Sequence, residues 1–219
     1  MPRLVRRTLA AAALAFTLAL PAGAQQVIHL QDAGNVAAFG YYVGPYHGLN
    51  LTVAPGGPLF NLFCVDFLHE VWIGQNWMAY ITPLAWNLNG RTRGGNAGLT
   101  QYRKAAWLTT QFASAPASAW GNIHATIWQI MTPGAPGEPN PSSSYWITQA
   151  NAHYMDGGAA FYNRFRLVTP TNMGQSTSAQ EFLTTATPTP EPPELILFGS
   201  GLAGMALLLA RRRRRLVNG

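Results

Sequence analysis

Residues 120–131 read WGNIHATIWQIM, and this stretch has the clearest helical pattern in the chain. Its large apolar side chains recur at spacings of three, four and seven residues: Trp120, Ile123, Ile127, Ile130 and Met131. This spacing places them on one face of an α-helix. Such a face is stable only when another layer of the domain covers it.

Two further helices are predicted on either side of this one. Upstream, residues 99–112 carry one helical face, made by Leu99, Tyr102, Ala105, Ala106, Thr109 and Phe112. Downstream, a loop rich in Pro, Gly and Ser over residues 132–144 precedes a third helix over residues 145–156. The Gly157-Gly158 pair is expected to end that helix.

Short apolar and aromatic runs separated by turn residues predict strands around these helices. They cover residues 26–31, 35–43, 49–53, 59–67 and 77–82, and after the helices residues 165–168 and 181–183. The order of strands, then helices, then strands favours an α+β domain. We expect a β-sandwich or barrel-like sheet with two to three helices, in an exported globular domain over residues 25–183.

The net charge of +6 arises at the two ends of the chain. It is the difference between 14 Lys and Arg and 8 Asp and Glu. Residues 25–189 contain six residues of each sign, so the body has no formal charge excess. A protein that binds nucleic acid needs a basic surface to neutralise phosphates, and we therefore exclude that class.

Residues 1–24 are typical of a secretory signal peptide. Three Arg precede an apolar run over residues 9–20, and Pro21 ends it. Ala22 and Ala24 fit the small-x-small pattern that signal peptidase cleaves. We therefore expect export through the secretory translocon, and a mature chain that begins near Gln25. A chain with one Cys forms no intramolecular disulfide.

The C-terminal region combines three features in order. Residues 184–189 begin a Thr/Pro linker, which disfavours helix and central strand. Residues 195–210 are sixteen uncharged, mostly apolar residues, just long enough for a single transmembrane helix. The basic stop that follows is expected to stay cytoplasmic and consists of Arg211, Arg212, Arg213, Arg214 and Arg215.

Pro190, Glu191 and Pro192, followed by the apolar span and the Arg cluster, resemble the PEP-CTERM sorting signal over residues 190–215. Pro193 departs from the small residue that commonly follows the motif. The resemblance implies processing by exosortase in a Gram-negative bacterium rich in exopolysaccharide. It also implies an inner-membrane intermediate, followed by release to the cell surface or the extracellular matrix of a biofilm.

Motifs typical of common enzymes and cofactor sites are absent from the sequence. There is no G-x-S-x-G, no Walker A and no dinucleotide fingerprint. His69-Glu70 has Ile73 where a zincin needs its second His. We predict no metal and no cofactor.

Three segments resemble bacterial thioester domains: FCVD at residues 63–66, YRKAAWL at 102–108 and IHATIW at 123–128. In that family a strand Cys and a Gln form an internal thioester. The matching positions here hold Cys64 and His124, and an imidazole cannot supply the carboxamide. Gln129 lies about 140° around the helix from His124, so it is a poor replacement. The resemblance therefore implies the thioester-domain fold without the internal thioester bond.

Cys64 and His124 face one another if this alignment holds. An imidazole beside a thiol can lower the pKa of the thiol and make it a nucleophile. The alternative is a buried Cys and a core His that hydrogen-bonds a backbone carbonyl.

The tryptophans supply a further candidate function, because flat rings stack on sugar faces. Trp107, Trp120 and Trp128 lie in the helical motifs and are expected to be core. The candidates for binding polysaccharide are therefore Trp72, Trp77, Trp86 and Trp146.

The preferred interpretation is a non-enzymatic, exported surface or matrix protein, adhesive or structural, with exopolysaccharide as an expected partner. The first alternative is a covalent adhesin or a Cys-dependent enzyme that uses Cys64. The second is a protein that keeps its C-terminal membrane anchor.

Overall fold

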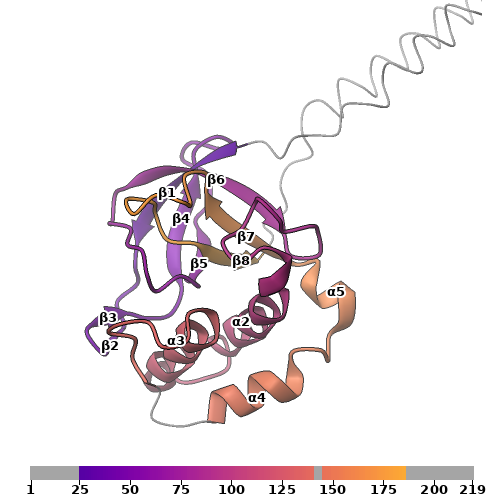
Figure 1. Cartoon of the computed structure of the whole chain (residues 1–219). Coiled ribbons are helices and arrows are strands. Elements are labelled where there is room, and N and C mark those ends of the chain that lie inside the picture. The colour runs from indigo at the N-terminus through magenta and orange to yellow at the C-terminus, as the bar shows by residue number, and fades with distance from the viewer. Residues whose placement is uncertain (1–24, 141–144, 186–219) are drawn as a thin grey trace, which may run out of the picture. The chain divides into compact units, whose positions relative to one another are not determined.

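Six antiparallel strands close into a barrel in the order β1-β4-β5-β8-β7-β6 (Figure 1). The computed structural model describes residues 25–140 and 145–185. The barrel strands are β1 (Gln25–Asp32), β4 (Tyr46–Asn50), β5 (Phe60–Cys64), β6 (Asn76–Pro83), β7 (Phe165–Pro170) and β8 (Phe182–Thr185). Closure gives every barrel strand two partners. The α+β class is confirmed, and the sheet is a barrel rather than a sandwich.

Helices pack against one side of the barrel (Figure 1). A 3₁₀ turn, η1 (Asn96–Gly98), leads into α2 (Leu99–Gln111), and α3 (Ala117–Met131) packs against α2. Within the described residues there are four α-helices, the other two being α4 (Tyr145–His153) and α5 (Gly158–Tyr162). The helical faces predicted for residues 99–112 and 120–131 are confirmed, since Tyr102, Ile123 and Ile127 are fully buried.

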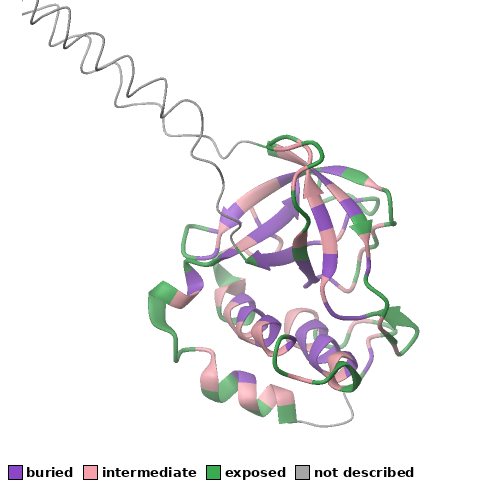
Figure 2. Cartoon of the chain, turned by 180° about the vertical axis from the view of Figure 1, so that it is seen from behind, coloured by how far each residue is buried: buried purple, intermediate pink, exposed green. Residues whose placement is uncertain are grey.

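Strand alternation divides the core into two clusters. In β7, Leu167 faces the cluster shared with the helices, while Val168 belongs to the cluster that fills the barrel. β8 alternates in the same way, with Leu183 among the residues packed on the helices and Phe182 among those inside the barrel. Figure 2 shows the resulting buried residues on the strands and on the helix faces toward the barrel. Strands buried on both sides read as continuous apolar runs rather than as alternating ones.

The strand predicted over residues 35–43 is wrong. Residues 37–42 instead form a small hairpin outside the barrel, from β2 (Ala37–Ala38) and β3 (Tyr41–Tyr42). Phe39 and Gly40 make its turn, with φ angles of 56° and 85°. Both angles lie in the left-handed region that hairpin turns require, so the chain reverses where a continuous strand was expected.

Gly121 of α3 lies against this hairpin. A Cβ atom built at Gly121 would lie 2.6 Å from the Cβ of Ala38, which is closer than two side chains can approach. Glycine inside a helix costs about 1 kcal/mol relative to alanine. The close approach of β2 to α3 explains why this position is nevertheless a glycine.

Other boundaries also differ from the prediction, and β4 and β5 end at Asn50 and Cys64 rather than at residues 53 and 67. β4 begins at Tyr46 rather than at residue 49, because pairing with β1 and β5 on both sides outweighs the weak strand propensity of His47 and Gly48. Residues 184 and 185, predicted as linker, belong to β8 and pair with β7, since β-branched Thr favours strands and no Pro intervenes. The third helix ends at His153, and Gly158, expected to be a stop, begins α5.

Several predicted features lie outside the described residues. They are the signal peptide over residues 1–24, the linker beyond residue 185, the sorting motif and the span over residues 195–210. Within residues 25–140 and 145–185, no helix combines the length and the apolar character that crossing a bilayer requires.

Candidate functional site

One end of the barrel carries a pocket of about 530 Å³. The end of β1, the start of β4 and the segment after β5 contribute to it, together with the β2–β3 hairpin and Trp128 of α3. Antiparallel pairing brings these strand ends together, because β1 and β5 end where β4 and β8 begin. We call it the aromatic pocket for its six lining rings, which are Tyr41, Tyr42, Tyr46, Phe67, Trp72 and Trp128.

Three of these rings form the packed part of the wall. The Tyr41 and Phe67 rings meet edge to face at 5.2 Å, and Trp128 lies 5.2 Å from Phe67 and 5.7 Å from Tyr41. Trp72 and Tyr42 remain accessible, with 70% and 52% of their surfaces exposed. The pocket therefore combines rings that pack on one another with exposed rings that a ligand can cover, and Tyr41, 41% exposed, belongs to both groups.

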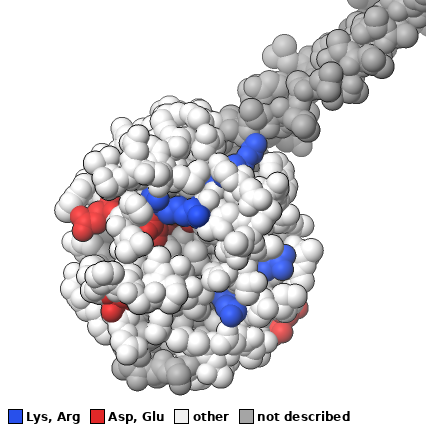
Figure 3. Space-filling model, in the orientation of Figure 1, with Lys and Arg blue, Asp and Glu red and all other residues white. Residues whose placement is uncertain are grey.

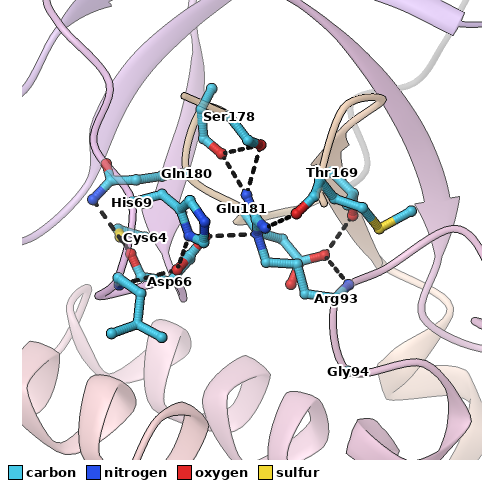
Figure 4. Close-up of polar contacts among 12 residues, drawn as sticks. Cys64, Asp66, His69, Arg93, Gly94, Thr169, Ser178, Gln180 and Glu181 are labelled. Carbon is cyan, nitrogen blue, oxygen red and sulfur yellow. Dashed lines mark hydrogen bonds and ion pairs between the residues drawn. The ribbon is translucent and has the colours of Figure 1, made fainter. Parts of the chain in front are cut away.

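The polar residues of the aromatic pocket are His69, Glu70 and Gln180. The His69 Nδ1 atom lies 2.9 Å from the Asp66 carboxylate, and the Gln180 side-chain amide donates to the Asp66 backbone carbonyl at 3.3 Å (Figure 4). Asp66 is 3% exposed. One buried residue thus fixes two polar side chains of the pocket wall.

Asp66 is itself held by Arg93, whose Nε atom lies 2.7 Å from the Asp66 carboxylate. The backbone N–H of Arg93 also donates to Glu181 at 3.1 Å, and Glu181 is 1% exposed. The hydroxyls of Tyr102 and Thr169 each donate to Glu181 at 2.5 Å. This buried network joins the loop before α2 to the segment before β8 (Figure 4).

Burial sets the direction of the pKa shifts in this network. Desolvation raises the pKa of Glu181, and its hydrogen bonds from Thr169, Tyr102 and Arg93 oppose that rise. Desolvation, followed by the charge of Glu181, raises the pKa of the Tyr102 hydroxyl. Tyr102 therefore stays a neutral donor to Glu181.

His124 lies beside Cys64, but both nitrogens of its imidazole bond to backbone groups rather than to the thiol. His124 accepts a hydrogen bond at Nδ1 from the Gly44 N–H at 2.9 Å, so its proton is on Nε2. That Nε2–H donates to the Cys64 backbone carbonyl at 3.0 Å. The Cys64 thiol instead donates to the Asp66 carbonyl at 3.3 Å and accepts from the Trp128 indole at 3.4 Å.

Both side chains are uncharged as a result of burial. Cys64 and His124 are 0% exposed. Desolvation raises the pKa of the Cys64 thiol to about 12 and lowers the pKa of His124 to about 4. The geometry is that of a buried Cys and a core His satisfied by a backbone carbonyl. It gives the thiol no adjacent base.

The four candidate tryptophans lie in four different environments. Trp72 lines the aromatic pocket, and Trp86 is 58% exposed but does not line that pocket. Trp77 is 8% exposed and lies in the barrel core, so its assignment as a candidate is wrong. Its side chain belongs to the face of β6 that points into the barrel. The short alternating run around Trp77 does not show which face of the strand is buried. Trp146 is partly buried against the helical core.

The expected core tryptophans follow the prediction more closely. Trp128 is 2% exposed and belongs to the barrel cluster while also lining the pocket. Trp107 and Trp120 are partly buried and pack on the helical cluster. Among the described residues, no group of three His, Cys, Asp or Glu is arranged to hold a metal ion.

The sequence did not identify His69, Glu70, Gln180 or the hairpin tyrosines as site residues. One signal was present: residues 67–73, FLHEVWI, place a Trp and an Ile between two strands without the alternation of a strand. Apolar side chains in such a connecting segment are candidates for a binding surface. The partnership of Asp66 with Gln180 spans more than a hundred residues and has no local signal.

Comparison with known proteins gives no match to any family model, any curated protein or any solved structure.

Proposed function

We propose that this chain is an exported, non-enzymatic adhesive or structural protein that binds polysaccharide at the cell surface or in the extracellular matrix. The aromatic pocket is the observation that carries the proposal. It offers the exposed faces of Trp72 and Tyr42 beside polar groups held by Asp66. Aromatic faces cover the apolar C–H surface of a sugar ring, while fixed polar groups bond its hydroxyls.

The two ends of the sequence support the proposed location. The expected signal peptide over residues 1–24 and the PEP-CTERM-like signal over residues 190–215 belong to an exported protein that exosortase processes. Both basic segments are removed in this route. The mature protein then presents a body with six charges of each sign to the matrix.

Affinity electrophoresis tests this proposal. Mature protein runs through native gels that contain exopolysaccharide from the producing bacterium. Wild type is expected to be retarded, Trp72→Ala to migrate as in an empty gel, and Trp86→Ala to behave as wild type. The Trp86 variant is the matched control, because it removes another exposed Trp ring, 58% exposed against 70% for Trp72, outside the pocket. Equal retardation of all three proteins would remove the basis of the proposal.

The alternative is a covalent adhesin or a Cys-dependent enzyme. One contact favours it: the Cys64 thiol touches Trp128, and Trp128 lines the aromatic pocket. Full burial and the raised pKa of Cys64 oppose it. Intact mass separates the two, because an internal thioester shows the loss of one ammonia and reacts with methylamine.

A further inference from the structure

Three donor-bearing side chains in the wall of the aromatic pocket are bonded to the protein. His69 uses Nδ1 toward Asp66, and Gln180 uses its side-chain amide toward the Asp66 carbonyl. The Trp128 indole N–H donates to the buried Cys64 sulfur. The exposed rings of Tyr41, Tyr42 and Trp72 still carry hydroxyl and indole donors, which are uncharged.

The same contacts leave acceptors free. A neutral imidazole that donates from Nδ1 keeps an acceptor lone pair on Nε2, and in this form His69 accepts from a ligand. The carboxamide oxygen of Gln180 is likewise an acceptor once its nitrogen is bound to Asp66. Glu70 adds a carboxylate, and it is the one acidic residue among the described residues that line the pocket. A ligand that donates hydrogen bonds suits this wall.

Cations are missing from the lining residues that the structure describes. The nearby guanidinium of Arg93 is committed to Asp66 through Nε and to Met173, Ser178 and Ala179 through its terminal nitrogens. Figure 3 shows one face of the molecule, where the few charged side chains are scattered among uncharged ones. An acidic sugar bound here would meet Glu70 without a counter-ion, and like charges in contact oppose binding.

We infer that the aromatic pocket takes a neutral polysaccharide and discriminates against acidic ones. This inference rests on the proposed function and names its ligand class. Hydroxyl groups of a neutral sugar donate to His69, Glu70 and Gln180, while its ring face covers Trp72. A uronate, a sulfate or a phosphate brings a second negative charge to Glu70, and no Lys or Arg among the described lining residues offsets it.

Calorimetric titration with matched glycans tests the charge preference. The probes are neutral α- and β-glucan oligosaccharides, and the same oligosaccharides oxidised at C6 to uronates. For the mature protein, at least one neutral glucan is expected to bind about tenfold more tightly than its oxidised form. Glu70→Gln is expected to reduce this ratio severalfold, and Asp156→Asn, outside the pocket, to leave it unchanged.

The possible outcomes distinguish failure of the charge preference from failure of the proposed polysaccharide binding. Oxidised glucans that bind as tightly as neutral ones, and lose binding in Trp72→Ala, overturn the charge preference and leave polysaccharide binding intact. Trp72-dependent binding of a peptide with the sequence of residues 186–193, with no glycan bound, assigns the pocket to a proline-rich partner and overturns both. If the protein binds none of the probes and exopolysaccharide does not retard it in the gel, both the charge preference and polysaccharide binding are overturned.

Discussion

His124 donates its Nε2–H to the backbone carbonyl of Cys64, at 3.0 Å, and leaves the Cys64 thiol to other partners. The histidine thus ties α3 to the end of β5, at the point where the chain leaves the barrel. An imidazole that activates a thiol must bond to the sulfur itself. The arrangement therefore assigns His124 a structural role and makes Cys64 part of the core.

Alkylation of Cys64 should reflect its burial. We expect native protein to react with iodoacetamide very slowly at neutral pH, because a thiol with a pKa of about 12 has almost no thiolate there. Protein unfolded in guanidinium should label fully. Mass spectrometry measures both. Rapid labelling of folded protein, with a titration midpoint below that of free cysteine, would show instead that the thiol is activated.

The stability of the fold should fall as pH falls between about 6.5 and 4. His124 has an ordinary pKa of 6.5 and a folded pKa of about 4, so the unfolded chain binds the proton first. The integrated loss is about 3 kcal/mol at most. The raised pKa of Glu181 acts in the opposite direction, since the folded state holds that proton more tightly. Urea unfolding of wild type and His124→Gln across this pH range isolates the contribution of His124 to the free energy of unfolding. Parallel pH profiles of the two proteins would contradict the lowered pKa of His124.

Removal of the Arg93 side chain should destabilise the protein strongly. Arg93→Met leaves the buried Asp66 carboxylate without its cation, and breaking such a pair costs about 3–5 kcal/mol. Arg91→Met, two residues away and outside the network, should change the free energy of unfolding by less than about 0.5 kcal/mol. Urea denaturation measures both. Similar losses of unfolding free energy in the two variants would mean that Arg93 stabilises the fold through its net charge or its local backbone propensity, and not through its ion pair with Asp66.

Substitution at Gly121 should disturb the hairpin that carries two rings of the aromatic pocket. Gly121→Ala brings a methyl group to 2.6 Å from the Cβ of Ala38, so β2 must move away from α3. We expect a loss of about 1–3 kcal/mol, despite the better helix propensity of alanine. The control is Gly174→Ala, where a Cβ meets no atom within 4 Å. A Gly121 variant as stable as wild type would indicate that the hairpin is loosely held.

Local sequence pattern predicted the helices well and the candidate site poorly. The spacing of Ile123 and Ile127 determined a buried helical face, because one side of a helix can be read from a few turns of sequence. The hairpin at Phe39 was missed because a non-glycine residue takes a positive φ there. The pocket depends on strand ends that meet only when the barrel closes, so residues such as Gln180 gave no local sign of their role.

Trp72 and Cys64 offer the most direct test of the central claim, which is that this protein works through an open aromatic pocket and not through its thiol. The measurement is equilibrium binding of the folded mature protein to exopolysaccharide, compared among wild type, Trp72→Ala and Cys64→Ala. We predict that Trp72→Ala weakens binding by about tenfold or more, as expected for the loss of an aromatic anchor. Cys64→Ala should bind as wild type does. Retained binding in Trp72→Ala together with lost binding in Cys64→Ala would contradict the account.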